Sequence, residues 1–289
     1  MSDRTKKSDV ARYYDFIYLW TQLTNRFGAF RAPQPHTIHR LLVDPETGSF
    51  DGETVHRLIA RHARTIGVVR ALDAGCGYGG SCMAMSRLVP GHWHGITINR
   101  TQVRVGARNA KALGLDAHVS IAYGSYDDPP PRAYNLIYGI ESLIHSVDPG
   151  RTIGNLAGAL DPGGLFIIVD DMPVESPPAA ARADLETFKR CWRCPVMPTA
   201  AEWSGLLRSA GLEIVAIDDL STLSRPGTHE HIERSLAEVE RRRRWLGPLG
   251  MGMVADAQVG GLVLELLSRD GVVRYTMIVA RRPASAPPS

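Results

Sequence analysis

Short apolar runs alternate with helical patterns along most of the chain from residue 53 onward. The runs have the length and the β-branched content of buried strands, and they read VVRALDA, WHGITI, AHVSIAY, YNLIYGI, LFIIVDD, LEIVAIDD and RYTMIVARR. Helical spacing of apolar residues separates several of them, over residues 53–66, 80–89, 101–114 and 150–160. Apolar strands that alternate with helices are typical of a parallel sheet covered on both faces. We therefore predict an α/β fold with a doubly wound, seven-stranded, mostly parallel sheet.

Two segments break this alternation, and both follow predicted strands. Residues 172–200 are rich in proline, and residues from about 221–260 combine a charged helix with the Gly- and Met-rich stretch LGPLGMGM. Insertions at the carboxyl ends of parallel strands are the natural cover for a ligand, so we predict that both segments are lids. The resulting domain spans residues 53–282, and the tail 283–289 is predicted to be disordered.

Residues 1–52 are predicted to form a helical cap ahead of this domain. Apolar positions over residues 10–27 follow three- and four-residue spacing, which predicts an amphipathic helix. Tyr14, Tyr18 and Trp20 on this helix are candidates for lining a substrate pocket.

Composition narrows the class of protein only modestly. The formal net charge of +3 over 289 residues gives no indication of nucleic-acid binding. Four cysteines are too few for a disulfide scaffold, and neither a signal-peptide pattern nor an apolar run of membrane length is present. We predict a soluble, cytoplasmic protein without nucleic-acid or membrane partners, and we leave open whether it forms a homo-oligomer.

Two smaller features carry little functional signal. Cys191 and Cys194 form a single C-x-x-C pair without a second pair, so we predict no metal site. The run Arg241–Arg244 lies on a helical pattern close to Glu238 and Glu240, and we interpret it as a solvated face.

The stretch LDAGCGYGGSC, residues 72–82, follows the first of these strands and concentrates glycine where a ligand can approach the backbone. Its G-x-G-x-x-G spacing matches the dinucleotide fingerprint, but that spacing alone is a weak signal. A P-loop is excluded because no Gly-Lys-Ser/Thr follows.

The residues around the glycines argue against a dinucleotide. An NAD site needs an acidic residue at the end of the next strand, where this chain has Thr97 and Asn99. Asp73 stands directly before the glycines, and its charge would repel a pyrophosphate. A cofactor that carries positive charge therefore fits the loop better.

With these motifs the chain resembles the class I S-adenosylmethionine-dependent methyltransferases over roughly residues 55–220. The resemblance rests on LDAGCGYGGS, GITINRTQV, YNLIYGIESLIHSVD and LDPGGLFIIVDD. The second of these is similar to the variant found in sterol, cyclopropane-fatty-acid and natural-product methyltransferases. The resemblance implies a Rossmann-like methyltransferase fold, S-adenosyl-L-methionine as the cofactor and a small molecule as the methyl acceptor.

The resemblance also implies roles for residues on the methionyl side of the cofactor. Asp73, Gly75 and Gly77 match the first motif of the family, and Tyr138 and Glu141 match the end of its fourth strand.

On the other side of the cofactor, the resemblance implies that Thr97, Ile98 and Gln102 border the ribose and adenine. The acidic residue that the family has before the fourth strand is missing here. We expect backbone groups of Ser125 and Tyr126 to take its place.

The identity of the acceptor group stays open between oxygen and carbon. For O-methylation of a specialised metabolite, which we favour, His145 is the candidate general base and Asp170 the residue that orients it. The alternative function for His145 is that of a loop histidine that packs or caps. For C-methylation of an alkene of a prenyl diphosphate or other isoprenoid, Glu141 is the candidate carboxylate.

Other residues are weaker candidates for the acceptor site. Trp192 is expected to fill the lid or the acceptor pocket, and His39 to approach the pocket from the N-terminal segment. A diphosphate acceptor needs arginines, and Arg31, Arg40 and Arg225 lie in the cap and lid segments. A third hypothesis is a module that binds the cofactor without transferring a methyl group.

Overall fold

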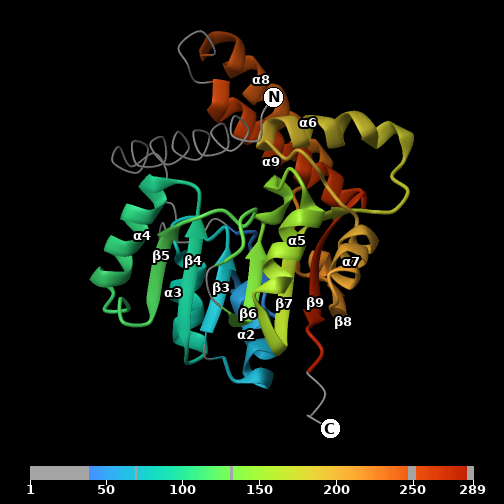
Figure 1. The fold of residues 1–289 in the computed structure, drawn as a ribbon. Helices are drawn as coiled ribbons and strands as arrows, with labels where there is room; N and C mark the ends of the chain where they lie inside the picture. Colours follow the sequence, from blue (N-terminus) through green and yellow to red (C-terminus); the bar gives the residue numbers. More distant parts are fainter. Residues whose placement is uncertain (1–38, 69, 131–132, 247–251, 285–289) are drawn as a thin grey trace.

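A seven-stranded sheet forms the centre of the molecule (Figure 1). The structure is a computed structural model that describes residues 39–68, 70–130, 133–246 and 252–284. The strands are β3 Arg70–Ala74, β4 His92–Thr97, β5 Val119–Tyr123, β6 Tyr134–Ile140, β7 Leu160–Pro173, β8 Glu213–Asp219 and β9 Val273–Arg281. They lie in the order β5-β4-β3-β6-β7-β9-β8, with β3 to β7 parallel and β9 antiparallel to both β7 and β8. The predicted doubly wound, mostly parallel sheet is confirmed.

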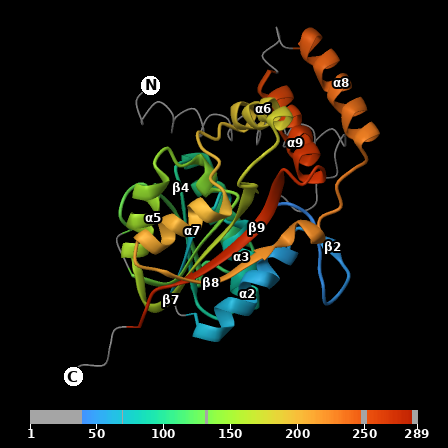
Figure 2. The ribbon, with the colours of Figure 1, turned by 90° about the vertical axis from the view of Figure 1, so that its right-hand side faces the viewer.

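Helices cover both faces of the sheet (Figures 1 and 2). One face carries α2 Thr54–Ile66, α3 Gly80–Leu88 and α4 Arg100–Ala112, and the other carries α5 Pro149–Gly158 and α7 Ala200–Ser209. Ile167 of β7 packs into the first apolar layer and its neighbour Ile168 into the second. Successive side chains of a strand point to opposite faces, so two buried faces require the continuous apolar runs seen in the sequence.

The start of β7 lies before the apolar run LFIIVDD that predicts this strand. Strand β7 already begins at Leu160, which pairs with Tyr134 of β6. Residues 161–164 then interrupt the ladder, which resumes at Leu165. Gly163 has a φ of 78°, a conformation that glycine adopts without a steric penalty. The interruption at residues 161–164 therefore lies inside the strand.

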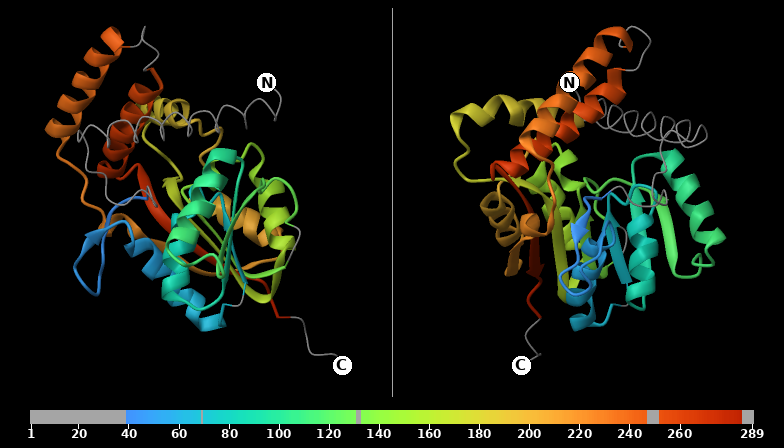
Figure 3. Two further views of the ribbon diagram at one scale, coloured as in Figure 1. Left: turned by 90° about the vertical axis from the view of Figure 1, so that its left-hand side faces the viewer. Right: turned by 180° about the vertical axis from the view of Figure 1, so that it is seen from behind.

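A third apolar cluster lies beyond the carboxyl ends of the parallel strands (Figures 1 and 3). Its helices are α6 Arg182–Trp192, α8 His229–Leu246 and α9 Gly252–Arg269. Phe188 of α6 and Val259 of α9 are buried between them, together with Ile144 of the short 3₁₀ helix η1, Leu143–His145, which follows β6. These helices come from the two segments predicted to be lids. Two further 3₁₀ turns are η2, Ala179–Ala181, and η3, Leu220–Leu223.

Parts of the predicted terminal segments lie outside the residues that the structure describes. The predicted helix over residues 10–27 lies outside the described residues, as does most of the predicted tail. Within the described part, none of the helices is both long and apolar enough to cross a membrane.

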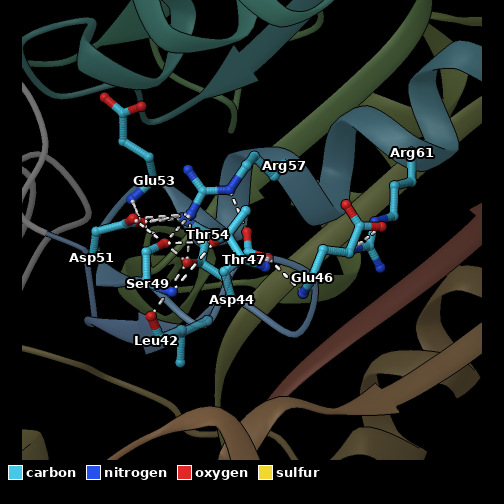
Figure 4. A network of polar contacts seen from close by, with 10 residues as sticks. All are labelled: Leu42, Asp44, Glu46, Thr47, Ser49, Asp51, Glu53, Thr54, Arg57 and Arg61. Carbon is cyan, nitrogen blue, oxygen red and sulfur yellow. Dashed lines mark hydrogen bonds and ion pairs between the residues drawn. The ribbon is translucent and has the colours of Figure 1, made fainter.

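A polar network fixes a short hairpin onto α2 (Figure 4). The hairpin consists of β1 Leu42–Val43 and β2 Phe50–Asp51. Arg57 of α2 binds the carboxylates of Asp44 and Asp51, the latter at 2.8 Å, and the Thr54 hydroxyl donates to the Leu42 carbonyl at 3.2 Å. Because residues 39–40 directly precede this hairpin, the network also determines where the chain enters the domain.

We expect the buried member of this network to contribute to stability. Asp44 is 2% exposed, and the hydrogen bond from Arg57 lowers the pKa of its carboxyl from 3.8 to about 2. The substitution Asp44→Asn should lower the free energy of unfolding at pH 7 by about 1–3 kcal/mol, as measured by urea unfolding. Since the pKa is lowered in the folded state, this contribution is complete above pH 4 and is lost as the pH falls toward 2.

A matched control is available in the same network. Glu46→Gln removes an ion pair with Arg61 in which the glutamate is 72% exposed, and it should change the stability by less than about 0.5 kcal/mol. Equal losses in the two variants would contradict the importance of the buried carboxylate.

Candidate active site

The glycine-rich stretch forms the loop between β3 and α3 and packs closely against its neighbours. The amides of Gly75 and Cys76 both donate to the Ile96 carbonyl of β4, at 3.1 and 3.0 Å. Gly75 has a φ of 98°, and a Cβ at this residue would lie 2.6 Å from the Cβ of Ser142, the second residue after β6. Any larger residue would therefore separate the loop from the end of β6.

Gly77 has a different environment from Gly75. Its φ is 54°, and a Cβ built there would meet no heavy atom of the described residues within 4 Å. The backbone at Gly77 thus borders open space at the carboxyl edge of the sheet. Of the two glycines, Gly77 is the one beside which the structure leaves room for a ligand.

Asp73 at the carboxyl end of β3 is a buried carboxyl with weak partners. It is 2% exposed, accepts a hydrogen bond from the Cys82 thiol at 3.6 Å, and is in register with Tyr138 of β6. Tyr138 is wholly buried, with its hydroxyl 3.9 Å from the Cys82 sulfur and its ring against Trp93. Burial raises the pKa of Asp73 to about 7, opposed in part by His39. A nearby cation would favour the ionised form.

Thr97, Ile98 and Gln102 come together at the carboxyl end of β4. The Thr97 hydroxyl donates to Gln102 Oε1 at 2.6 Å, and both side chains are buried. Asn99 caps α4 by accepting hydrogen bonds from the amides of Thr101 and Gln102 at 2.8 and 3.0 Å, while Ile98 is half-buried. The cap explains why the helix begins at this point.

Ser142 joins three segments of the site, a role that the sequence did not reveal. Its hydroxyl donates to the Ala74 carbonyl at 2.6 Å, and its own carbonyl accepts from the Tyr126 hydroxyl at 3.2 Å. The hydroxyl of Ser125, next to Tyr126, donates a hydrogen bond to the buried Asp127 carboxylate at 3.3 Å. The only signal in the sequence was the position of Ser142 inside the motif YNLIYGIESLIHSVD.

Glu141 occupies a strained position directly after β6. Its φ of 50° lies in the left-handed region, where strain persists only if surrounding contacts hold it. Oε1 accepts from the backbone amide of Arg40 at 3.0 Å and from the Tyr275 hydroxyl at 2.7 Å, while Oε2 lies 4.0 Å from His39 Nδ1. Burial pushes the pKa of Glu141 upward, but these contacts outweigh burial and hold it below its ordinary value.

Arg40 is held by several groups at once. Its guanidinium donates to the Asp171 carboxylate at 2.7 Å and to the Ser268 hydroxyl of α9 at 3.2 Å, and it lies 5.1 Å from the centre of the Tyr275 ring. Burial raises the pKa of Asp171 to about 6, even beside this cation. Arg40 therefore connects the segment before the hairpin with β7, β9 and α9.

His39 extends the polar network toward the glycine-rich loop. Its Nε2 lies 2.7 Å from the hydroxyl of Ser81, in the first turn of α3, and His56 Nε2 lies 3.1 Å from the same hydroxyl. Burial lowers the pKa of His56 to about 3, so this imidazole is neutral at pH 7. A polar path thus runs from α3 through His39 to Glu141.

His145 and Asp170 are the predicted general base and its orienting residue, and each has a hydrogen-bond partner in the backbone. His145 Nδ1 lies 3.4 Å from the Arg193 carbonyl oxygen, and burial lowers the pKa of this imidazole to about 4. Asp170 is 1% exposed and accepts from the Asp171 amide at 3.0 Å, and its Oδ2 has no hydrogen-bond partner among the described residues. The orienting role of Asp170 toward His145 stays a prediction.

Trp192 lies in the packing between α6 and α9. Its Nε1 donates to the Ala257 carbonyl at 3.1 Å, and its place in an acceptor pocket stays a prediction. Tyr14, Tyr18 and Trp20 lie outside the described residues.

The arginine run and the cysteine pair are the remaining sequence features. Arg241 and Arg242 both pair with Glu238 on the exposed side of α8. Cys191 and Cys194 are free and buried. In the described ranges, no three His, Cys, Asp or Glu residues are grouped as they would be in a metal site.

Together, these observations define a class of protein. The strand order reverses at β3, and the glycine-rich loop and polar side chains meet at the carboxyl ends of β3, β4 and β6. This is the ligand-binding position of doubly wound α/β proteins. The chain belongs to the methyltransferase domain family, whose model matches residues 11–217.

Individual relatives support this assignment. The 27-O-demethylrifamycin SV methyltransferase of Amycolatopsis mediterranei is 32% identical over 217 residues, which cover 74% of this chain and 77% of that protein. The O-methyltransferase rstn1 of Aspergillus nomiae is 26% identical over 177 residues, covering 60% of this chain and 76% of its own. A solved structure of geranyl diphosphate methyltransferase in complex with GPP and sinefungin shares the fold, with a TM-score of 0.69 and 19% identity. The match covers 96% of this chain and 99% of that one.

The chain is therefore an S-adenosylmethionine-dependent methyltransferase, and its residues fit that cofactor. Gly77 borders open space. The pKa of Asp73 is raised because burial outweighs the effect of its neighbours, so a cation bound nearby would stabilise the ionised carboxylate. S-adenosylmethionine brings positive charge on both its sulfonium and its ammonium groups. Asp73, Gly75, Gly77, Thr97, Ile98 and Gln102 lie along one edge of the sheet.

We expect Asp73 to destabilise the cofactor-free protein as the pH rises. Its pKa is 3.8 in the unfolded chain and about 7 in the folded one, so between these values the folded state retains a proton that the unfolded state has released. Stability therefore falls from pH 4 to pH 7. We therefore expect the free energy of unfolding of Asp73→Asn, relative to that of the natural protein, to rise by about 2–3 kcal/mol from pH 5 to pH 8. Urea unfolding at the two pH values measures this change.

The control for this experiment is Asp128→Asn, which changes a carboxylate that is 70% exposed. Its stability difference from the natural protein should not vary with pH. If Asp73→Asn behaved in the same way, the carboxyl of Asp73 would not be buried and protonated as described.

Proposed function

We propose that this enzyme transfers a methyl group from S-adenosylmethionine to a hydroxyl group of a small specialised metabolite, in the cytoplasm. The observation that carries the proposal is the position of the His145 imidazole, which lies three residues after Ser142, beyond the carboxyl end of β6, and whose pKa burial lowers to about 4. The names of the two relatives, a demethylrifamycin O-methyltransferase and an O-methyltransferase, support the same acceptor chemistry.

The proton of the acceptor hydroxyl is the main chemical requirement on the protein. When bound, S-adenosylmethionine supplies an activated methyl group on a positively charged sulfur. A hydroxyl that accepts this group must lose its proton to a base. His145 has a pKa of about 4 and is therefore unprotonated at pH 7, with a lone pair to accept that proton.

Glu141 is suited to a second role near the cofactor. Contacts with His39, the Arg40 amide and the Tyr275 hydroxyl hold the pKa of Glu141 below its ordinary value, although burial raises it. A fixed negative charge in a dry site interacts strongly with a cation. We infer that Glu141 helps to orient the positively charged end of the cofactor, while Asp73 ionises when that charge arrives.

The alternative is C-methylation of an isoprenoid alkene. The carboxylate of Glu141, which accepts from the Tyr275 hydroxyl, favours it, because a carboxylate stabilises a carbocation. Two of the candidate arginines already have other partners, which argues against a diphosphate acceptor. Arg40 binds Asp171, and Arg225 lies 5.3 Å from the centre of the Phe50 ring. O-methylation is therefore the better supported function.

One experiment separates these functions. The enzyme is incubated with methyl-deuterated S-adenosylmethionine and a panel of hydroxylated polyketides, phenols and geranyl diphosphate, and the products are analysed by mass spectrometry and NMR. Label on oxygen supports the proposal, and label on carbon supports the alternative. Tight cofactor binding without transfer to any member of the panel would point to a module without methyltransferase activity.

We expect His145→Ala to lower kcat for O-methylation by about 10²-fold or more, the scale of general-base catalysis. Cofactor affinity, measured by calorimetry, should stay the same. Because burial lowers the pKa of His145 to about 4, kcat of the natural enzyme at saturating cofactor should decline only as the pH approaches 4. The control His118→Ala changes an exposed histidine and should retain full activity; an unchanged rate in His145→Ala would remove this residue as the base.

The two loop glycines should respond differently to alanine. Gly77→Ala should weaken cofactor binding by about tenfold or more and change thermal stability little beyond the ~1–2 kcal/mol of left-handed strain, since its Cβ enters the open space. Gly75→Ala should mainly lower the melting temperature, because its Cβ would collide with Ser142. Calorimetry with S-adenosylmethionine and thermal unfolding measure both effects. Unchanged affinity in Gly77→Ala would show that the cofactor does not contact this position.

A further inference from the structure

Within the described residues, two non-glycine residues have a positive φ, and both border the candidate site. They are Glu141, at 50°, and Arg193, at 58°. Arg193 ends α6, where a left-handed residue is common but is usually glycine. The strained turn aims the Arg193 carbonyl at His145 Nδ1, at 3.4 Å. Strain at a non-glycine residue is informative where it positions a functional group.

The direction of this hydrogen bond identifies the proton on His145. A carbonyl oxygen can only accept, so Nδ1 must carry the hydrogen. The Cys194 sulfur lies 4.0 Å from Nδ1, but its own thiol hydrogen has an acceptor in the Trp192 carbonyl at 3.6 Å. In the opposite tautomer, the lone pair of Nδ1 would face the carbonyl oxygen.

The side chain of Arg193 fastens the turn to the neighbouring helices. Its guanidinium donates to the Arg190 carbonyl at 2.9 Å and to Asp256 of α9 at 3.3 Å. The other carboxylate oxygen of Asp256 pairs with Arg243 of α8 at 3.1 Å. Asp256 is 16% exposed, so this contact is partly shielded from water. Three helices thus hold one backbone carbonyl in place.

We propose that the Arg193 carbonyl fixes His145 in the Nδ1–H tautomer, and that the ion pair between Arg193 and Asp256 holds this carbonyl in place. In this tautomer, Nε2 is the nitrogen that takes the proton from the substrate hydroxyl. Arg193 and Asp256 are positioning residues that act through His145. The part played by Nε2 rests on the proposed function, whereas the tautomer does not depend on any substrate. In serine proteases a buried aspartate performs the corresponding orientation, and here a backbone carbonyl does so.

The tautomer is measured directly by NMR on the full chain labelled with ¹⁵N-histidine at pH 7.5, with the His145 signals assigned by their loss in His145→Gln. The proposal expects the ¹⁵N shift of a protonated ring nitrogen at Nδ1 and of a bare nitrogen at Nε2. The reverse pattern overturns it. If Nδ1 is protonated but the enzyme methylates no hydroxyl, the proposed function fails while the tautomer assignment stands.

A variant tests the anchoring contact. Arg193→Gln removes the ion pair with Asp256, and we expect it to mix the two tautomers and to lower kcat about fivefold, with cofactor affinity unchanged. The matched control Arg242→Gln removes an exposed arginine that pairs with Glu238 on α8, and it should leave both readouts as in the natural protein. A pure Nδ1–H tautomer and full activity in Arg193→Gln would overturn the role of the ion pair. If that variant does not fold, Asp256→Asn breaks the same pair from α9 and carries the same expectation.

Discussion

The site depends on the close contact between the loop after β3 and the second residue after β6. Gly75 packs so tightly against Ser142 that no Cβ fits between them, and the Ser142 hydroxyl binds the carbonyl just before the loop. Tyr126 closes the same junction from the segment after β5. Because strands β3 and β6 are parallel neighbours, this junction brings Asp73 and Glu141 to one edge of the sheet. A looser junction would leave the carboxyls on separate loops.

Buried carboxyls dominate the electrostatics of this edge. Asp73 and Asp171 have raised pKa values because burial outweighs their partners, whereas Glu141 has enough donors to stay ionised. Arg40 balances part of this charge through its bond to Asp171. Buried carboxyls at this edge favour a ligand with a net positive charge. S-adenosylmethionine has such a charge, whereas the pyrophosphate makes a dinucleotide negative overall.

The two halves of the site are supported by different parts of the fold. The loop, Asp73, Thr97 and Gln102 belong to the sheet and its first helices, whereas His145 contacts the turn at the end of α6, which α8 and α9 hold in place. Cofactor binding and acceptor chemistry can therefore vary separately. This separation agrees with the range of acceptors named for relatives and structural neighbours on a common fold.

The sequence by itself determined the sheet, the glycine-rich loop and the family. These features depend on local patterns: apolar runs, glycine at special dihedral angles, and short motifs. The partners of the site residues were decided only by the tertiary structure. His39 and Arg40 reach Glu141 across about a hundred positions of sequence, and Ser142 gains its role because parallel strands end side by side. The contact of His145 with the carbonyl of Arg193 likewise joins positions 48 residues apart. Every residue carries a carbonyl, so no pattern of side chains distinguishes the one that the fold places beside the imidazole.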